Sequence, residues 1–196
     1  MKSTSPVAAA STVLSGKQSL RSLRQGGFTL IELGIVIAII AILAIIAIPL
    51  INGYILGGKV TPMSKDLQQA VSGIRSLAAG VTTATPYSGV NTATLAGFLR
   101  DTNFNVSGNT ITHSLQAPGQ NPQTVTVAGT SGATFTVQLN SVHEKVCPDL
   151  ASQLAKVAET ITIGSTSVKA ASTALDLAAT RTACVAAGAN MTFVFR

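Results

Sequence analysis

Few residues of this chain are placed where they could do chemistry, and the clearest is a carboxylate inside an apolar run. Glu32 lies in the segment GGFTLIELGIVIAIIAILAIIAIPLI, which covers residues 26–51, and residues 33–58 carry no charge. About 20 apolar residues cross a bilayer core as a helix, so this run is long enough to span a membrane. A central acidic side chain costs about 2.5–3.5 kcal/mol there, and such residues usually have a partner. The chemistry expected of Glu32 is therefore charge pairing.

The other reactive side chains give no catalytic or metal-binding signal. His113 and His143 are far apart and lack metal-ligand spacing. The triplet at residues 57–59, Gly-Gly-Lys, lacks the spacing and the flanking strand of a phosphate-binding loop. We therefore predict no catalytic residue, no metal ligands and no cofactor. Both histidines are expected at the surface or in turns.

The positive charge is concentrated ahead of the apolar run. The 196-residue chain has a formal net charge of +6, but the first 31 residues contain no acid. Without the first 27 residues, nine Lys/Arg remain against seven Asp/Glu, a formal charge of +2. Basic residues beside a membrane span set its orientation, with the basic end in the cytoplasm. Without a basic and aromatic stripe in the remainder, no specific nucleic-acid site is expected.

Two cysteines, Cys147 and Cys184, lie in the later part of the chain. A basic leader and a membrane segment indicate export, so we predict that the two form a disulfide. The bond would close a loop of 38 residues, which is worth about 4 kcal/mol of stability in the chain-entropy model. The alternative is a pair of buried free thiols.

Two ordinary targeting segments explain residues 1–58 incompletely. A secretory signal peptide has an apolar region of about 7–15 residues followed by a small-x-small cleavage site. Here the run is longer, and no such site follows it. A permanent anchor with its basic residues in the cytoplasm explains the charges and the length. It leaves Glu32 and the Gly-Gly-Phe junction unexplained.

A third explanation accounts for these features together. The basic leader, the Gly-Phe junction, the glutamate and the long apolar run resemble the N-terminal signature of type IV prepilins. In that family a prepilin peptidase cuts after the last glycine and methylates the new amino terminus. The resemblance implies cleavage between Gly27 and Phe28, N-methylation of Phe28, and Glu32 as the fifth mature residue. The 27-residue leader and the wide cysteine spacing favour type IVb, whereas Phe28 is commoner in type IVa.

Cleavage would give Glu32 a partner, the amine of Phe28 one helical turn earlier, or that of a neighbouring subunit. An unpaired charge is penalised inside a helix bundle, so this pair would select the axial register as well as add affinity. The alternative is that Glu32 lies at the interface and reaches water. Pro49 lacks an amide hydrogen and its ring clashes with a carbonyl one turn back, and family members often lose helix near such a proline. We predict a bent or locally melted zone over residues 45–58.

The remainder of the chain has the pattern of a small α+β domain. Beyond Pro62 the pattern predicts an amphipathic helix that ends near Gly80. Its apolar face consists of Met63, Leu67, Ala70, Val71, Ile74, Leu77 and Ala78. The opposite face consists of Lys65, Asp66, Gln68, Gln69, Ser72 and Arg75. A turn-rich connection is expected over residues 81–107. Strands are expected at residues 110–115, 123–128, 134–139, 160–163, 167–169 and 191–195, with a helix from Pro148 and a short helix within residues 175–186.

The resemblance implies an α+β type IV pilin fold. Its long N-terminal helix has a protruding hydrophobic half and packs on a small antiparallel sheet, followed by a disulfide-bounded C-terminal region. The expected domains are a cleaved leader (1–27), a hydrophobic transmembrane and assembly helix (28–58) that includes Pro49, and a globular extracytoplasmic domain (59–196).

The function implied is that of a non-enzymatic structural subunit of a type IV pilus. The precursor is expected in the bacterial inner membrane, and the product in an extracellular filament for adhesion, aggregation, motility or DNA transfer, including conjugation. The expected partners are other pilin subunits, prepilin peptidase, the pilus assembly platform, inner-membrane lipid before assembly, and a host or cell-surface receptor. The alternatives are a minor pilin, a type II secretion pseudopilin, which usually lacks the C-terminal disulfide, and a membrane-anchored periplasmic binding or catalytic domain.

Overall fold

The computed structural model of the chain describes residues 28–116, 119–120, 123–130, 132–185 and 188–196. By its internal contacts the chain divides into two units between Ile42 and Leu43. The second unit contains the sheet and most of the helices. We call residues 60–196 of this unit the head. The leader and Gly27 lie outside the described residues.

The first element is α1 (Leu30–Ala79), a helix of 50 residues. Near its start the Thr29 hydroxyl oxygen accepts a hydrogen bond from the backbone N–H of Glu32, at 3.2 Å, which satisfies one of the donors that a helix N-terminus leaves free. The helix ends just before Gly80. Two different surfaces follow one another along it, because none of its residues before position 48 is buried whereas from Val60 onward one face is buried.

The helix α1 is continuous through Pro49, so of the predicted bent or locally melted zone over residues 45–58 the melted form is wrong, and the bend stays a prediction. A proline removes one backbone hydrogen bond. The turns on both sides can hold the backbone across that single gap, as they do in many membrane helices. The missing backbone N–H of Pro49 was therefore not enough to interrupt a helix that the neighbouring residues favour.

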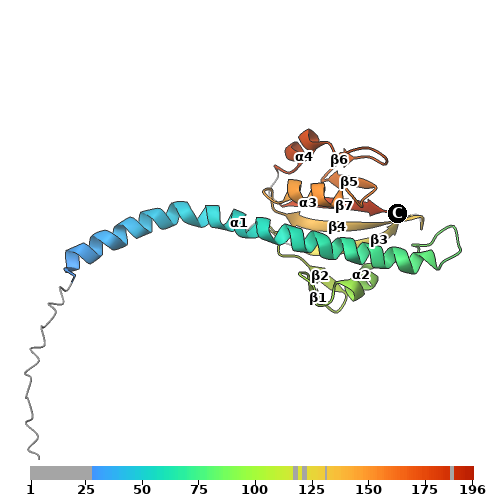
Figure 1. Cartoon of the computed structure of the whole chain (residues 1–196), viewed down its shortest axis with the longest axis horizontal. Helices are drawn as coiled ribbons and strands as arrows, with labels where there is room; N and C mark the ends of the chain where they lie inside the picture. The colour runs from blue at the N-terminus through green and yellow to red at the C-terminus, as the bar shows by residue number, and fades with distance from the viewer. Residues whose placement is uncertain (1–27, 117–118, 121–122, 131, 186–187) are drawn as a thin grey trace, which may run out of the picture. The chain divides into compact units, whose positions relative to one another are not determined.

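The head contains one antiparallel sheet of seven strands, in the order β1-β2-β3-β4-β7-β5-β6 (Figure 1). The strands in chain order are β1 (Asn105–Ser107), β2 (Thr110–Thr112), β3 (Thr124–Thr130), β4 (Thr134–Val142), β5 (Thr160–Ile163), β6 (Thr166–Lys169) and β7 (Ala189–Phe195). The C-terminal strand β7 pairs with β4 on one side and β5 on the other, so the end of the chain lies in the middle of the sheet.

The described residues of the head also form three shorter helices: α2 (Thr92–Leu99), α3 (Cys147–Leu154) and α4 (Leu177–Ala183). The helix α2 contacts β2 and β3, whereas α4 contacts β6 and α3. In Figure 1, α2 and α4 accordingly lie on opposite sides of the head.

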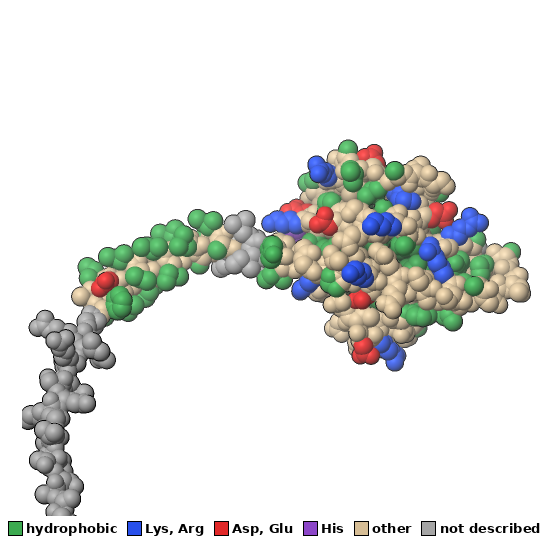
Figure 2. Space-filling model, viewed as in Figure 1, with side chains coloured by type: hydrophobic (Ala, Val, Ile, Leu, Met, Phe, Trp, Pro, Cys, Tyr) green, Lys and Arg blue, Asp and Glu red, His purple; other side chains and the backbone are tan. Residues whose placement is uncertain are grey.

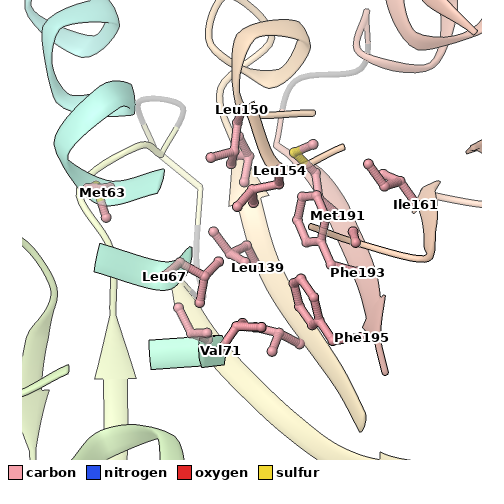
Figure 3. Packing of buried hydrophobic residues seen from close by; sticks show 14 of the residues in the cluster. Met63, Leu67, Val71, Leu139, Leu150, Leu154, Ile161, Met191, Phe193 and Phe195 are labelled. Carbon is pink, nitrogen blue, oxygen red and sulfur yellow. The ribbon is translucent and has the colours of Figure 1, made fainter. Parts of the chain in front are cut away.

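The core lies between the sheet, the second half of α1 and α3 (Figure 3). Alternating residues of β4 and β7 point into it, as expected for strands with one buried face, and they are Phe135, Val137, Leu139, Met191, Phe193 and Phe195. From α1 and α3 come Met63, Leu67, Val71, Leu150 and Leu154. The Phe135 ring centroid lies 5.4 Å from that of Phe195 and 5.1 Å from that of Tyr87, distances that suit favourable aromatic pairs.

The expected order of elements is confirmed with two omissions. The helix α2 and the strand β1 lie inside the stretch predicted as a turn-rich connection. Asn91 caps α2, because its side chain accepts from the backbone N–H of Thr94 while the Thr94 hydroxyl oxygen accepts from the N–H of Asn91. This capping pair was the one local signal for α2 in the sequence.

Candidate functional site

The beginning of α1 carries the residues that sequence reasoning selected. Phe28 is 79% exposed, and Glu32 lies in the first turn of the helix. A carboxylate at this end is favoured by the helix dipole. Among the described residues Glu32 forms no ion pair. The nitrogen of Phe28 is a peptide nitrogen in the uncut chain, so an ion pair with Glu32 requires cleavage.

The apolar surface that follows is uncovered. The window Leu30–Ala47 has a mean hydropathy of 3.0, is long enough to cross a membrane, and has none of its residues buried. Figure 2 shows hydrophobic side chains along this described start of α1. Such a surface is far more apolar than the exterior of a soluble monomer, so it marks contact with lipid or with other apolar helices. Pro49 lies just beyond this window, within the helix.

The second half of α1 is held to α3 and to the turn that follows α3 by polar side chains. The Ser64 hydroxyl donates to Oε1 of Gln153, and Nε2 of Gln68 donates to the backbone oxygen of Gln153 at 3.2 Å. Further along, the guanidinium of Arg75 donates to the carbonyl oxygen of Val157 at 3.0 Å. We call these three contacts the α1–α3 seam. They fix both the rotation and the axial position of α1 against the head.

A further polar contact joins α1 to the segment after α2. Oδ2 of Asp66 accepts from the backbone N–H of Asn103 at 2.9 Å and from its Nδ2 at 2.7 Å. Periodicity placed Asp66, Gln68 and Arg75 on a polar face of the helix, and the structure shows that all three bind the head. Sequence reasoning missed these contacts because their partners lie far away in the chain.

The predicted disulfide between Cys147 and Cys184 is confirmed. Its Cα atoms lie 5.7 Å apart, and it joins the first residue of α3 to the residue that ends α4. The side chain of Asp176 caps α4 by accepting from the N–H groups of Ala178 and Ala179. Within α4 itself, Thr180 is the single buried residue. The disulfide is therefore a principal attachment of α4 to the core.

The expectation that both histidines are surface or turn residues is wrong for His113. This residue is 3% exposed. Its Nε2 lies 2.7 Å from the carbonyl oxygen of Asn140, and its Nδ1 accepts from the N–H of Leu115 at 3.2 Å. These partners define a neutral ring with its proton on Nε2, and burial lowers the pKa of His113. His143 follows β4, is partly exposed, and accepts at Nδ1 from the N–H of Lys145.

The described part of the chain brings no set of potential metal ligands together. It contains no group of three or more His, Cys, Asp or Glu side chains that could hold a metal ion. Of the residues chosen from the sequence, Phe28 and Glu32 lie near one another, and Cys147 and Cys184 are bonded. The candidate site is thus the exposed start of α1, together with the contacts that hold the rest of α1 to the head.

Comparison with known proteins gives matches to both parts of the chain. A family model described as the PilS N-terminal region matches residues 59–196. The model of the prokaryotic N-terminal methylation motif matches residues 22–48. A search of curated proteins found no match. A solved type IVb pilin from Salmonella typhi is similar, with 16% identity and a TM-score of 0.47 over 66% of this chain and 95% of that chain.

Proposed function

Because the chain belongs to the PilS family and is a type IV prepilin, we propose that it is a structural subunit that assembles into a type IV pilus through its N-terminal helix. The observation that carries the proposal is that the apolar window Leu30–Ala47 has no buried residue, although the same chain has a head with a buried core of its own. A folded head does not need this surface. This surface can contact lipid while the chain is in the membrane, and it can then pack against the same helix of other copies.

Processing is the first step of the proposal. Prepilin peptidase cuts between Gly27 and Phe28 on the cytoplasmic side and methylates the nitrogen of Phe28. The cut creates a cation one helical turn from Glu32. The methylation motif spans this junction, and the basic leader supports an orientation with the junction in the cytoplasm.

Assembly is the second step. The amine of Phe28 and the carboxylate of Glu32, from the same or a neighbouring subunit, attract one another inside the helix bundle. Since an unpaired charge in that bundle is penalised, the pair favours one axial register. Pro49 lies in the helix between this pair and the head, and it is proposed as the position at which α1 adjusts on leaving the bilayer.

Localisation and partners follow from these steps. The precursor resides in the inner membrane with lipid around α1, and the product is an extracellular filament. The proposed partners are other copies of the chain, prepilin peptidase and the assembly platform. For a receptor, the candidates are the exposed residues within 81–107 and within the disulfide loop between Cys147 and Cys184. The proposed role is structural and needs no catalytic residue.

Mass spectrometry and electron microscopy of filaments sheared from the cell surface test the proposal together. We expect abundant filaments made of a chain that begins at N-methylated Phe28 and has an oxidised Cys147–Cys184 pair. A chain with an intact leader and no polymer would overturn the proposal in favour of a membrane-anchored domain. A processed chain present in trace amounts would indicate a minor pilin, and one absent from surface filaments a pseudopilin.

A further inference from the structure

Exposed apolar and basic side chains lie together around the point where α1 enters the head. Tyr54 on α1 is 87% exposed, and Val185, which follows α4, is 70% exposed. Lys145 and Arg181 are exposed cations in the same region. In Figure 1, α3 and α4 lie at this end of the head. We call Tyr54, Lys145, Arg181 and Val185 the base patch.

Lys145 reaches from the head back onto α1. Its side chain lies over Gly53, where an added Cβ atom would be 3.0 Å from the Lys145 Cδ and 3.1 Å from its Nζ. Because Gly53 has no side chain, the ammonium can lie directly against the helix. A lysine whose stem lies along a helix while its ammonium stays in polar surroundings is typical of membrane interfaces.

The position of Gly53 along α1 corresponds to the headgroup layer of a bilayer. The apolar window Leu30–Ala47 has 18 residues, which cover about 27 Å, close to the roughly 30 Å of a hydrocarbon core. Gly53 comes after Ala47 by a further rise of about 9 Å, and the polar layer on each side of the core is about 5–8 Å thick. The Lys145 ammonium therefore lies near the outer edge of this layer. Tyr54 lies at the same depth, and tyrosine is enriched at membrane interfaces.

A groove beside the disulfide extends the base patch. It encloses about 240 Å³ and is lined by Glu144, Lys145, Pro148, Arg181, Cys184 and Val185. Pockets for small molecules usually enclose roughly 300–1,000 Å³, so this groove suits one part of a larger ligand. Its cations match a phosphate, and its apolar residues match the glycerol and upper acyl chain of a lipid.

The charges around the base patch leave an excess of one cation. Within the groove, Lys145 and Arg181 oppose the single acid Glu144. Outside it, Lys59 on α1 and Asp149 in the first turn of α3 are both exposed and balance one another. Among the described residues, Lys145 and Arg181 form no ion pair. The net attraction is therefore to an anionic surface within a Debye length, about 8–10 Å at physiological salt.

We propose that the base patch and its groove bind the headgroup of an anionic phospholipid, and so seat the head on the outer leaflet of the inner membrane before assembly. Lys145 and Arg181 face the lipid phosphate, while Val185 contacts the apolar part of the lipid. This inference rests on the proposed function, because that function places α1 in the bilayer with the head outside. Extraction of the chain into a filament would release the lipid.

Tryptophan fluorescence of the full chain in nanodiscs tests the contact. The chain contains no tryptophan, so Val185→Trp introduces a single one at the exposed rim of the groove. We expect strong quenching by spin-labelled headgroups in discs that contain phosphatidylglycerol, and weak quenching in discs of phosphatidylcholine alone. The matched control is Val81→Trp. Val81 is partly exposed and follows the end of α1, about 39 Å along the helix from Gly53, so its quenching should be weak in both discs.

Neutral variants in the Val185→Trp background test the two cations. A basic residue near an anionic membrane surface strengthens binding by about fivefold. Lys145→Gln combined with Arg181→Gln should therefore lower the ratio of docked to free heads by about tenfold or more. The matched control is Lys156→Gln, an exposed lysine beside Val157, whose carbonyl oxygen accepts from Arg75 far along α1. This variant should leave the quenching unchanged.

Three outcomes would overturn the inference. They are no quenching of Val185→Trp, equal quenching of Val185→Trp and Val81→Trp, and quenching that the double neutral variant does not reduce. Filaments sheared from cells that express the unsubstituted chain test the proposed function separately. A docked head in a chain that never polymerises would contradict that function alone, whereas normal filaments without docking in the discs would contradict this inference alone.

Discussion

Nε2 of His113 donates to the carbonyl oxygen of Asn140 across 2.7 Å, and this bond joins the segment after β2 to β4 inside the head. The opposite ring nitrogen accepts from the N–H of Leu115. The ring therefore satisfies two buried backbone groups only in its neutral form. A proton on Nδ1 would break the bond from Leu115 and place a charge in the core.

This arrangement predicts a loss of stability below neutral pH. Burial lowers the pKa of His113 in the folded head, whereas in the unfolded chain it is about 6.5. The unfolded state then binds more protons, so the stabilisation is complete above pH ~6.5 and declines as the pH falls below that value toward the folded pKa. Denaturant unfolding of the full chain in detergent at a series of pH values measures the decline. His113→Gln should flatten the pH dependence in this range, and an unchanged slope would contradict the assignment.

Glu32→Gln is expected to abolish most filament assembly while leaving the head folded. The substitution keeps the size of the side chain and removes the charge that we propose pairs with the amine of Phe28. Breaking a buried ion pair costs about 3–5 kcal/mol, or about a hundredfold or more in association. The yield of sheared filaments measures the effect, with Glu159→Gln on the head as the matched control. Normal yields from Glu32→Gln would disprove the pairing.

Replacement of both cysteines by serine is expected to loosen α4 before the rest of the head. Closure of this loop stabilises the head by about 4 kcal/mol in the chain-entropy model, and α4 has little burial of its own. Hydrogen exchange should rise first over Leu177–Ala183, while β4 and β7 stay protected. Equal protection of α4 with and without the disulfide would contradict its role as an attachment.

Substitution of Asp66 tests the contact between α1 and the segment after α2. Asp66→Ala removes both hydrogen bonds to Asn103, and because the site is partly exposed we expect a loss of about 1–2 kcal/mol. Asp66→Asn keeps an acceptor oxygen and should lose less. Lys65→Ala, an exposed neighbour on the same helix, is the control and should be near neutral. The free energy of unfolding ranks the three variants, and a larger loss for Lys65→Ala would contradict the contact.

Local patterns predicted most of the sheet because its strands have one buried face. The strand β5 was predicted with its observed bounds, and β7 was predicted apart from its first two residues. The helix α2 was missed because threonines and a glycine give its sequence a weak helical propensity. Leu77, predicted on the buried face of α1, is 61% exposed, whereas the ring of Phe98 covers Gly73 one turn earlier, a tertiary contact that the periodicity of a single helix does not contain.

The candidate site likewise has one part that the sequence predicted and another part that it did not. The junction at Phe28, the carboxylate of Glu32 and the apolar run are contiguous, so the sequence was sufficient to select them. The α1–α3 seam joins residues 82–89 positions apart in the chain. Each partner has many polar alternatives, and only the folded arrangement shows which of them meet.

The α1–α3 seam also determines how the head bears mechanical load. From Ser64 to Arg75 the seam covers about 16 Å of helix, and all its bonds connect α1 to the same short stretch of chain, from Gln153 to Val157. A pull along the axis of α1 loads these bonds together, in shear, so no single bond must carry the force. A sideways pull would instead break them one after another, as in peeling. The head should therefore resist axial tension better than lateral force.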